Sequence, residues 1–129
     1  MGLMSDWTSG QLDKIGAADE LEIAALRPDG SLRPYTTIWV VRVGDDLYVR
    51  SYRGRGGAWF RSVLRRPDGR IRAAGVERDV TFQEVSDEGR EAIDQAYREK
   101  YASRYASTYV DPMLSPDAAA ATLRLVPAD

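Results

Sequence analysis

Cysteine and histidine are both absent from the 129-residue sequence. Without cysteine, disulfide bonds, thiolate nucleophiles and cysteine-based metal sites are excluded. Without histidine there is no Ser-His-Asp or Cys-His triad, no zinc site of the usual ligand types, and no side chain that readily shuttles protons near neutral pH. We therefore predict no metal site, and we expect a cofactor to supply the chemistry if the protein is an enzyme.

Long apolar runs are also missing. No stretch approaches the roughly 18 apolar residues of a membrane-spanning helix, and the sequence does not open with a charged segment followed by an apolar run. We therefore expect a cytoplasmic protein with no membrane partner. The hydrophobic fraction of 43% and the charged fraction of 29% are ordinary for a folded domain. The length predicts one domain, residues 1–129, with a single core.

Positive charge is concentrated in one segment, although the net charge is only −2. Residues 50–72 carry a charge of +7, which leaves −9 for the remainder of the chain. The arginines of this segment are Arg50, Arg53, Arg55, Arg61, Arg65, Arg66, Arg70 and Arg72, and its one acid is Asp68. The segment overlaps "YVRSYRGRGGAWFRSVLRR", residues 48–66, in which glycines and arginines separate an expected strand from an expected helix.

Alternating apolar residues, turn residues and helical spacings divide the chain into short elements. We expect short helices at residues 8–16 and 56–66, and one long helix at 87–105 near the C-terminus. Strands are expected at residues 20–26, 34–43, 47–52, 70–76, 79–85 and 120–127, with a turn at 76–79. The predicted class is therefore α+β, a closed or half-open barrel of six mostly antiparallel strands with short flanking helices.

The glycine-rich loop before the second helix is a candidate anion site. A helix that begins directly after such a loop leaves backbone N–H groups unpaired, and its dipole is positive at that end. Arg53 and Arg55 add guanidinium donors that match phosphate oxygens. Gly56 and Gly57 allow a ligand to approach the backbone closely.

The spacing within this loop does not identify a ligand, because it matches neither the dinucleotide fingerprint Gly-x-Gly-x-x-Gly nor a P-loop. Ser51 adds a hydroxyl, and Arg50 could reach the same point only if it faces the loop side of its strand. The alternative is a solvated, arginine-rich turn whose glycines only permit a tight reversal from strand to helix.

Aromatic residues near the loop and on the long helix have two interpretations. Trp59 is either a core anchor in the first turn of its helix or a platform for a bound ring. Tyr97, Tyr101 and Tyr105 recur every four residues, which predicts a packing stripe with polar ends. Lys100 lies beside that stripe, and its cation could turn toward a phosphate.

Four segments in order, "YVRSYRGRGGAW", "GRIRAAGVERDVTFQEV", "IDQAYREKY" and "TLRLVP", resemble the "domain of unknown function 2255" family. That family is placed among the flavin-binding split β-barrels, beside pyridoxamine phosphate oxidases and deazaflavin-dependent nitroreductases. The resemblance runs from about Trp7 to Pro127. It implies a six-stranded split barrel that pairs into a homodimer and holds a flavin or deazaflavin at the subunit interface.

The resemblance also implies a location for the cofactor phosphate. In the nitroreductase-like relatives, a strand ending in Ala-Ser, a glycine loop and a tryptophan border that phosphate. Here Arg50 and Ser51 stand at the Ala-Ser position, and Trp59 lies near the tryptophan position. An earlier Gly-Arg-x-Ser-Gly-Lys turn of those relatives corresponds to "RPDGSLRPY", which keeps a glycine, a serine and Arg33.

The leading hypothesis is therefore a homodimeric oxidoreductase that uses FMN or a deazaflavin on a small molecule, with no catalytic residue identified in the chain. The candidate cofactor-binding residues are Arg50, Ser51, Arg53, Arg55, Gly56, Gly57 and Trp59, with Arg33 and Lys100 as further candidates.

Four alternatives remain at this point. The protein could be a non-enzymatic module for a phosphorylated ligand or cofactor, or a barrel whose cofactor site is vacant. It could also be an apolar cavity lined by Tyr35, Trp39 and Trp59. Nucleic-acid binding would draw on the basic segment, but the −9 remainder would repel a long polyanion, so we predict no nucleic-acid partner.

Overall fold

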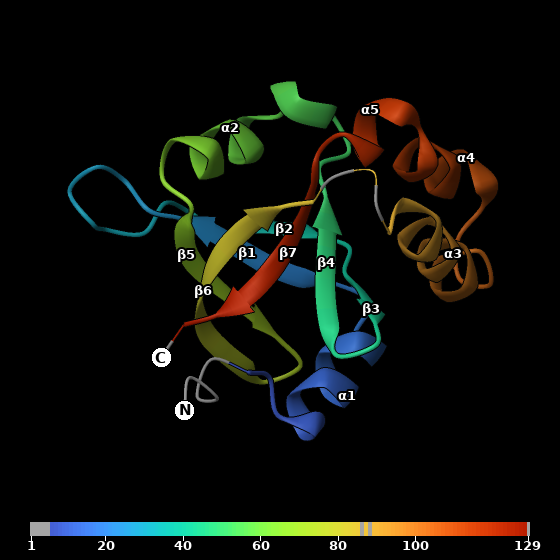
Figure 1. Ribbon diagram of the computed structural model, residues 1–129, viewed down its shortest axis with the longest axis horizontal. Coiled ribbons are helices and arrows are strands. Elements are labelled where there is room, and N and C mark those ends of the chain that lie inside the picture. The colour runs from blue at the N-terminus through green and yellow to red at the C-terminus, as the bar shows by residue number, and fades with distance from the viewer. Residues whose placement is uncertain (1–5, 86, 88, 129) are drawn as a thin grey trace.

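The computed structural model of the protein describes residues 6–85, 87 and 89–128. Within these residues, seven strands form one antiparallel sheet in the order β2-β1-β5-β6-β7-β4-β3, and the sheet curls into a half-barrel (Figure 1). The strands are β1 (Leu21–Ala25), β2 (Thr36–Ile38), β3 (Val41–Val43), β4 (Asp46–Arg50), β5 (Asp68–Ala73), β6 (Val76–Glu84) and β7 (Thr122–Pro127). The helices are α1 (Ser9–Ala17), η2 (Gly54–Gly56), α2 (Ala58–Arg65), α3 (Arg90–Tyr101), α4 (Ser107–Val110), η3 (Asp111–Leu114) and α5 (Pro116–Ala119).

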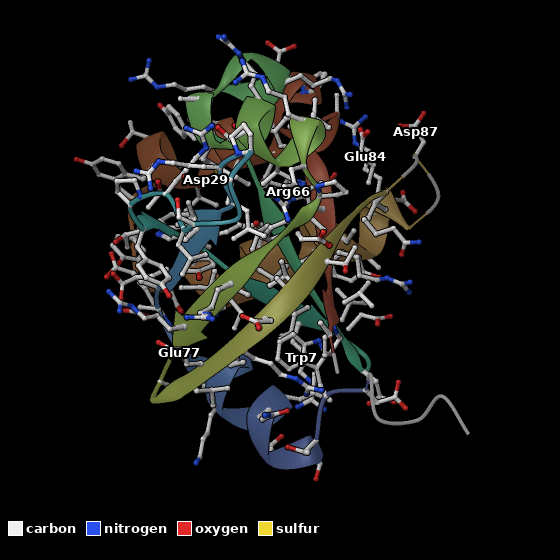
Figure 2. The ribbon with its side chains drawn as sticks, turned by 90° about the vertical axis from the view of Figure 1, so that its left-hand side faces the viewer. Trp7, Asp29, Arg66, Glu77, Glu84 and Asp87 are labelled. Carbon is white, nitrogen blue, oxygen red and sulfur yellow. The ribbon has the colours of Figure 1, made fainter. Side chains whose placement is uncertain are left out.

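Alternation along the strands fills the inside of the half-barrel. In β7, Leu123 and Leu125 are buried, whereas Arg124 between them is half-buried and lies on the other face. Helices α1 and α2 cover opposite ends of the half-barrel, and each buries two side chains against the same core (Figure 1). At the α1 end, the indole of Trp7 donates a 3.0 Å hydrogen bond to the Leu125 carbonyl (Figure 2).

The predicted strand at residues 34–43 is wrong in one respect, because it is two strands. β2 pairs with β1 at one edge of the sheet, and β3 pairs with β4 at the other edge. Only Trp39 and Val40 link them, so the chain steps directly from one edge to the other. This step curls the sheet into the split barrel and raises the strand count from the predicted six to seven. The predicted α+β class and split-barrel architecture are confirmed.

The predicted turn at residues 76–79 is also wrong. The β5–β6 hairpin turns at Ala74 and Gly75, where φ is +50° and +81°, so β6 runs unbroken from Val76. Positive φ at both central residues is the geometry of the tight hairpin turn that matches strand twist. Asparagine-glycine is its usual signature, and alanine carries none of that signal.

Helix α3 and the short helices after it form a second layer against the β3–β4 edge (Figure 1). Tyr97 and Tyr101 are fully buried there, which confirms the predicted packing stripe. The Tyr101 ring stacks on Trp39 with centroids 4.0 Å apart and planes at 6°. None of the helices in the described part of the chain is long and apolar enough to cross a membrane.

The backbone of Val40 shows how the two-residue link is stabilised. Val40 is fully buried and lies between strands, so no ladder partner satisfies it. Its N–H donates to the Tyr101 hydroxyl at 3.1 Å, and its carbonyl accepts from Lys100 Nζ at 2.6 Å. The Tyr101 hydroxyl also lies 2.7 Å from the Asp19 carbonyl, to which it donates. Two side chains of α3 therefore replace the missing strand partner.

A buried ion pair joins the second layer to the half-barrel. Arg50, at the end of β4, is 1% exposed, and its Nη1 donates to Asp94 Oδ1 of α3 at 2.5 Å. The same nitrogen donates to the Met113 carbonyl of η3 at 2.9 Å, and Nε donates to Thr122 Oγ1 of β7 at 3.0 Å. Four separate elements therefore meet at one guanidinium.

We expect Tyr101→Phe to lower the free energy of unfolding by about 1–3 kcal/mol, because the buried Val40 N–H loses its acceptor. Tyr97→Phe is the matched control on the same helix, since the Tyr97 hydroxyl is buried with no hydrogen-bond partner among the described residues. That change should be neutral or stabilising. Urea denaturation measures both, and equal losses would contradict the assignment of the Val40 bond.

We expect Asp94→Ala to lower the free energy of unfolding by about 3–5 kcal/mol, because Arg50 keeps its charge in a buried place with no counter-ion. Glu84→Ala removes the carboxylate partner of Arg55, but both of those side chains are about half exposed. Its cost should stay near or below about 1 kcal/mol. Chemical denaturation of both variants checks this difference, and a small loss for Asp94→Ala would refute the central role of the pair.

Candidate functional site

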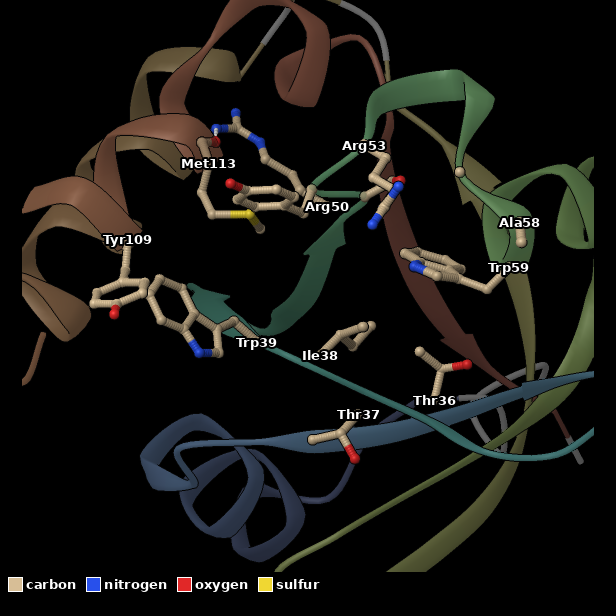
Figure 3. A pocket seen from close by; sticks show the side chains of 13 residues that line it. Thr36, Thr37, Ile38, Trp39, Arg50, Arg53, Ala58, Trp59, Tyr109 and Met113 are labelled. Carbon is tan, nitrogen blue, oxygen red and sulfur yellow. Dashed lines mark hydrogen bonds between the residues drawn. The ribbon is translucent and has the colours of Figure 1, made fainter.

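A hollow of about 450 Å³ lies where the free edge of β2, the glycine loop and the short helices α4 and η3 face one another (Figure 3). Trp39 and Tyr109 stand on one side of it, and Arg53 and Trp59 point into it from the other. Met113 extends from η3 between these two sides. The volume falls in the range of small-molecule sites, which begins near 300 Å³.

The glycine loop folds as a tight turn that leads into α2. Gly54 has a φ of +69°, and its N–H donates to the Ser51 carbonyl at 3.0 Å. A Cβ on Gly57 would lie 2.6 Å from the buried Ser51 hydroxyl, so glycine is required for this approach. Gly57 is also the N-cap of α2, and no side chain caps the helix there. The first N–H groups of α2 therefore remain available beside the hollow.

Arg53 is the cation of the loop that faces the hollow. Its side chain is exposed and forms no ion pair with any residue that the structure describes. Trp59 is half-buried, packs on the barrel core and lines the hollow at the same time. Packing on the core is therefore confirmed, and the position of Trp59 in the wall is compatible with its other interpretation, a platform for a bound ring.

Arg50 contributes to the wall in another way than Arg53. Its backbone end lines the hollow next to Ser51, but its guanidinium extends away toward Asp94 and the Met113 carbonyl (Figure 3). We expected Arg50 to reach a ligand at the loop only if its side chain faced the loop side of β4. Its guanidinium faces away from the loop, so this requirement is not met. One guanidinium nitrogen, Nη2, is buried without a partner among the described residues.

Arg55 and Gly56 do not line the hollow. Arg55 Nη1 donates to Glu84 Oε1 at 2.6 Å and to the Ala120 carbonyl at 3.1 Å. The charge of Arg55 is therefore engaged on the far side of the loop, although only one residue separates it from Arg53 in the chain.

Arg33 lines a second hollow of about 260 Å³ that adjoins the first. The two hollows share Thr36, Ala58 and Trp59 as walls. Arg33 Nε is buried and has no hydrogen-bond partner within the described residues. The structure thus brings Arg33 into one hollow with Trp59 from a distant part of the sequence, whereas Ser51 and Arg53 line only the other hollow.

Lys100 lies outside both hollows. Burial lowers the pKa of its ammonium group to about 8, Arg104 adds to that shift, and Asp19 partly opposes it. Its bond to the Val40 carbonyl makes it a residue of the Trp39–Val40 link. Burial also raises the pKa of Tyr101 above its usual range, so this hydroxyl remains protonated in the bond to Val40.

Sequence reasoning missed Thr36, Tyr109 and Met113 as lining residues. Tyr109 and Met113 lie in the segment between the long helix and the last strand. Its sequence has no site motif, and its two prolines predict only a loop. Thr36 reaches the hollow because β2 is an edge strand, which depends on the break at Trp39 and Val40. Across residues 6–85, 87 and 89–128, no three metal-ligating side chains gather into a metal site.

Solved structures with the same fold include proteins of several functions. A protein of Listeria innocua described as a candidate pyridoxamine 5′-phosphate oxidase superimposes with a TM-score of 0.64 at 15% identity, covering 92% of this chain and 90% of that one. An F420 reductase superimposes with a TM-score of 0.59 at 14% identity, covering 95% of this chain and 97% of that one. The haem storage protein HutZ of Vibrio cholerae superimposes with a TM-score of 0.62 at 13% identity, covering 94% of this chain and 90% of that one. These identities establish a shared fold only.

Sequence comparison gives a narrower result. No curated protein matches the chain. One family does match, and it covers residues 11–125, from helix α1 to the middle of β7. This span includes the glycine loop, both hollows and the Arg50–Asp94 pair. The chain therefore belongs to the family described as "Uncharacterized protein conserved in bacteria (DUF2255)".

Proposed function

We propose that the larger hollow binds a flavin or deazaflavin by its phosphate, and that the protein is an oxidoreductase acting on a small molecule. The observation that carries this proposal is the combination at one end of the hollow. Arg53, which has no ion-pair partner in the described part of the chain, the start of α2 without a side-chain cap, and the close approach of Gly57 to Ser51 together suit a phosphate group.

The remaining walls suit a planar ring. Trp39 and Trp59 border the hollow from opposite sides, and neither carries charge. Arg33, in the adjoining hollow, is placed to meet a second polar group of an elongated cofactor. Arg55 and Lys100 receive no ligand role here, since both cations are already bonded within the protein.

The bound ring would supply hydride or electron transfer, and the chain would hold it and exclude water. The F420 reductase among the solved relatives supports a deazaflavin, and a Mycobacterium smegmatis relative described as an FAD and haem binding protein supports a flavin. Haem fits this chain less well, because it has neither the histidine nor the cysteine that most often ligates haem iron.

We further propose that a second copy of the chain covers the mouth of the hollow. Tyr52 and Tyr109 both line it and are 61% and 64% exposed, so two large aromatic side chains lie in solvent at one opening. The β2 edge beside them also has no strand partner among the described residues. Covering these groups would bury apolar surface and complete the site.

Cofactor retention tests the site. We expect the purified protein to take up FMN or a deazaflavin, seen as absorbance between about 350 and 500 nm. Arg53→Ala should weaken this binding about 10- to 100-fold, since a hydrogen bond to a charged group contributes about 1.5–3 kcal/mol. Arg55→Ala is the matched control two residues away and should change affinity by less than about threefold, because its cation is held by Glu84.

Three results would count against this assignment. Absence of binding by the unaltered protein would refute the cofactor proposal itself. Equal losses of cofactor affinity in Arg53→Ala and Arg55→Ala would mean that binding depends on the net charge of the loop and not on the position of Arg53. Tight binding without turnover under any reductant would favour the non-enzymatic carrier over the oxidoreductase.

Pairing of two copies can be tested separately. Light scattering should give twice the mass of one chain, and Tyr109→Asp should shift the protein toward monomer because it places a charge in the covered surface. Thr108→Asp adds the same charge to the same helix at an exposed residue that does not line the hollow, and it should leave the dimer intact. A monomeric unaltered protein would refute the pairing.

A further inference from the structure

The outer face of α2 carries arginines that form no ion pair with a carboxylate of the described residues. Arg61 and Arg65 lie one turn apart and are exposed, and Leu64 between them is 40% exposed. Arg66 follows the helix as its C-cap, and its Nη1 donates to the carbonyls of Arg27 and Pro28. We call Arg61, Leu64, Arg65 and Arg66 the α2 face. Figure 2 looks toward this part of the molecule, with α2 at the top and Arg66 beneath it.

The absence of counter-ions on this face is not general in the protein. Eight other arginines of the described residues form ion pairs with carboxylates. The nearby acids do not compensate the α2 face. Asp29 accepts from Ser31 and Asp68 accepts from Thr81, and neither carboxylate forms an ion pair within the described residues. The positive charge of the face is therefore available to a partner.

The α2 face also adjoins the mouth of the larger hollow. The first residues of α2, Ala58 and Trp59, line that hollow, and Arg53 lies just before the helix. Eight residues of helix extend about 12 Å from this mouth. A molecule bound along the α2 face would thus lie beside the opening of the proposed cofactor site.

We propose that the α2 face docks a compact acidic protein. Charge complementarity favours an acidic partner, and the exposed Leu64 among the arginines favours a protein over a nucleic acid, because protein interfaces combine arginine with apolar contact. The rest of the chain carries a net charge of about −9 outside residues 50–72, which repels an extended polyanion but leaves a small contact area on α2 open. The proposal does not require a cofactor in the hollow.

The test is a binding titration with one defined probe, an acidic flavodoxin that carries a fluorescent label. Fluorescence anisotropy measures its binding at low and at high salt concentration. The unaltered protein should bind it at low salt and release it as the ionic strength rises. The double variant Arg61→Ala/Arg65→Ala should bind about tenfold more weakly. Arg98→Ala, which removes an exposed arginine of α3 remote from the α2 face, is the matched control and should bind like the unaltered protein. Leu64→Ser should weaken binding at every salt concentration.

Equal binding by the unaltered protein and the double variant would overturn the proposal, and so would an equal loss in Arg98→Ala. Tighter binding of a DNA duplex or of phosphatidylserine vesicles in the same buffer would also overturn it, in favour of those partners. Cofactor retention is measured on the same protein preparations before the flavodoxin is added, because flavodoxin carries its own flavin. Loss of flavodoxin binding with cofactor retained refutes only the docking face, whereas binding without any cofactor uptake refutes only the proposed function.

Discussion

The ion pair between Arg50 and Asp94 is the contact on which the proposed site depends most. Arg50 ends β4 immediately before the glycine loop, and Asp94 lies in the middle of α3. The same guanidinium donates to the Met113 carbonyl, and the Met113 side chain extends from η3 into the hollow between its two sides. One buried cation therefore fixes the distance between the loop that would grip a phosphate and the helices that close the hollow. Burying a charge of this kind without its partner costs folding free energy, so loss of the pair would displace both the loop and the helices.

A second constraint is the short step from β2 to β3. Two residues cross from one edge of the sheet to the other, which leaves Val40 without a strand partner and turns Trp39 toward the hollow. Lys100 and Tyr101 satisfy the Val40 backbone, and the Tyr101 ring supports Trp39 from behind. Lys100 thus acts on the site only through the position of the link. The wall of the hollow is built by α3 as much as by the sheet.

The sequence predicted most local elements, because alternation, helical spacing and glycines are local signals. It also predicted the loop and Trp59 as site candidates. The break at Trp39 and Val40 could not be predicted, since the run of β-branched and aromatic residues there continues across it without a turn residue. The partners of the arginines were equally hidden. Arg50 pairs with a carboxylate 44 positions later and Arg55 with one 29 positions later, so residue type and spacing within the loop contain no information about either.

The basic segment therefore does not act as one uniform patch of charge. Arg50 is buried and structural, and Arg55, Arg70 and Arg72 are neutralised by carboxylates of other strands. What remains positive is Arg53 at the mouth of the hollow and the arginines on the outer face of α2. Exposed cations without counter-ions lose little on meeting an anion, because no existing ion pair must be broken first. Within residues 50–72, the charge that has no carboxylate partner among the described residues is thus directed to two neighbouring places, the hollow and the helix beside it. Helix α2 also supplies a wall to the hollow, so a partner bound to its outer face would lie close to a ligand in the hollow.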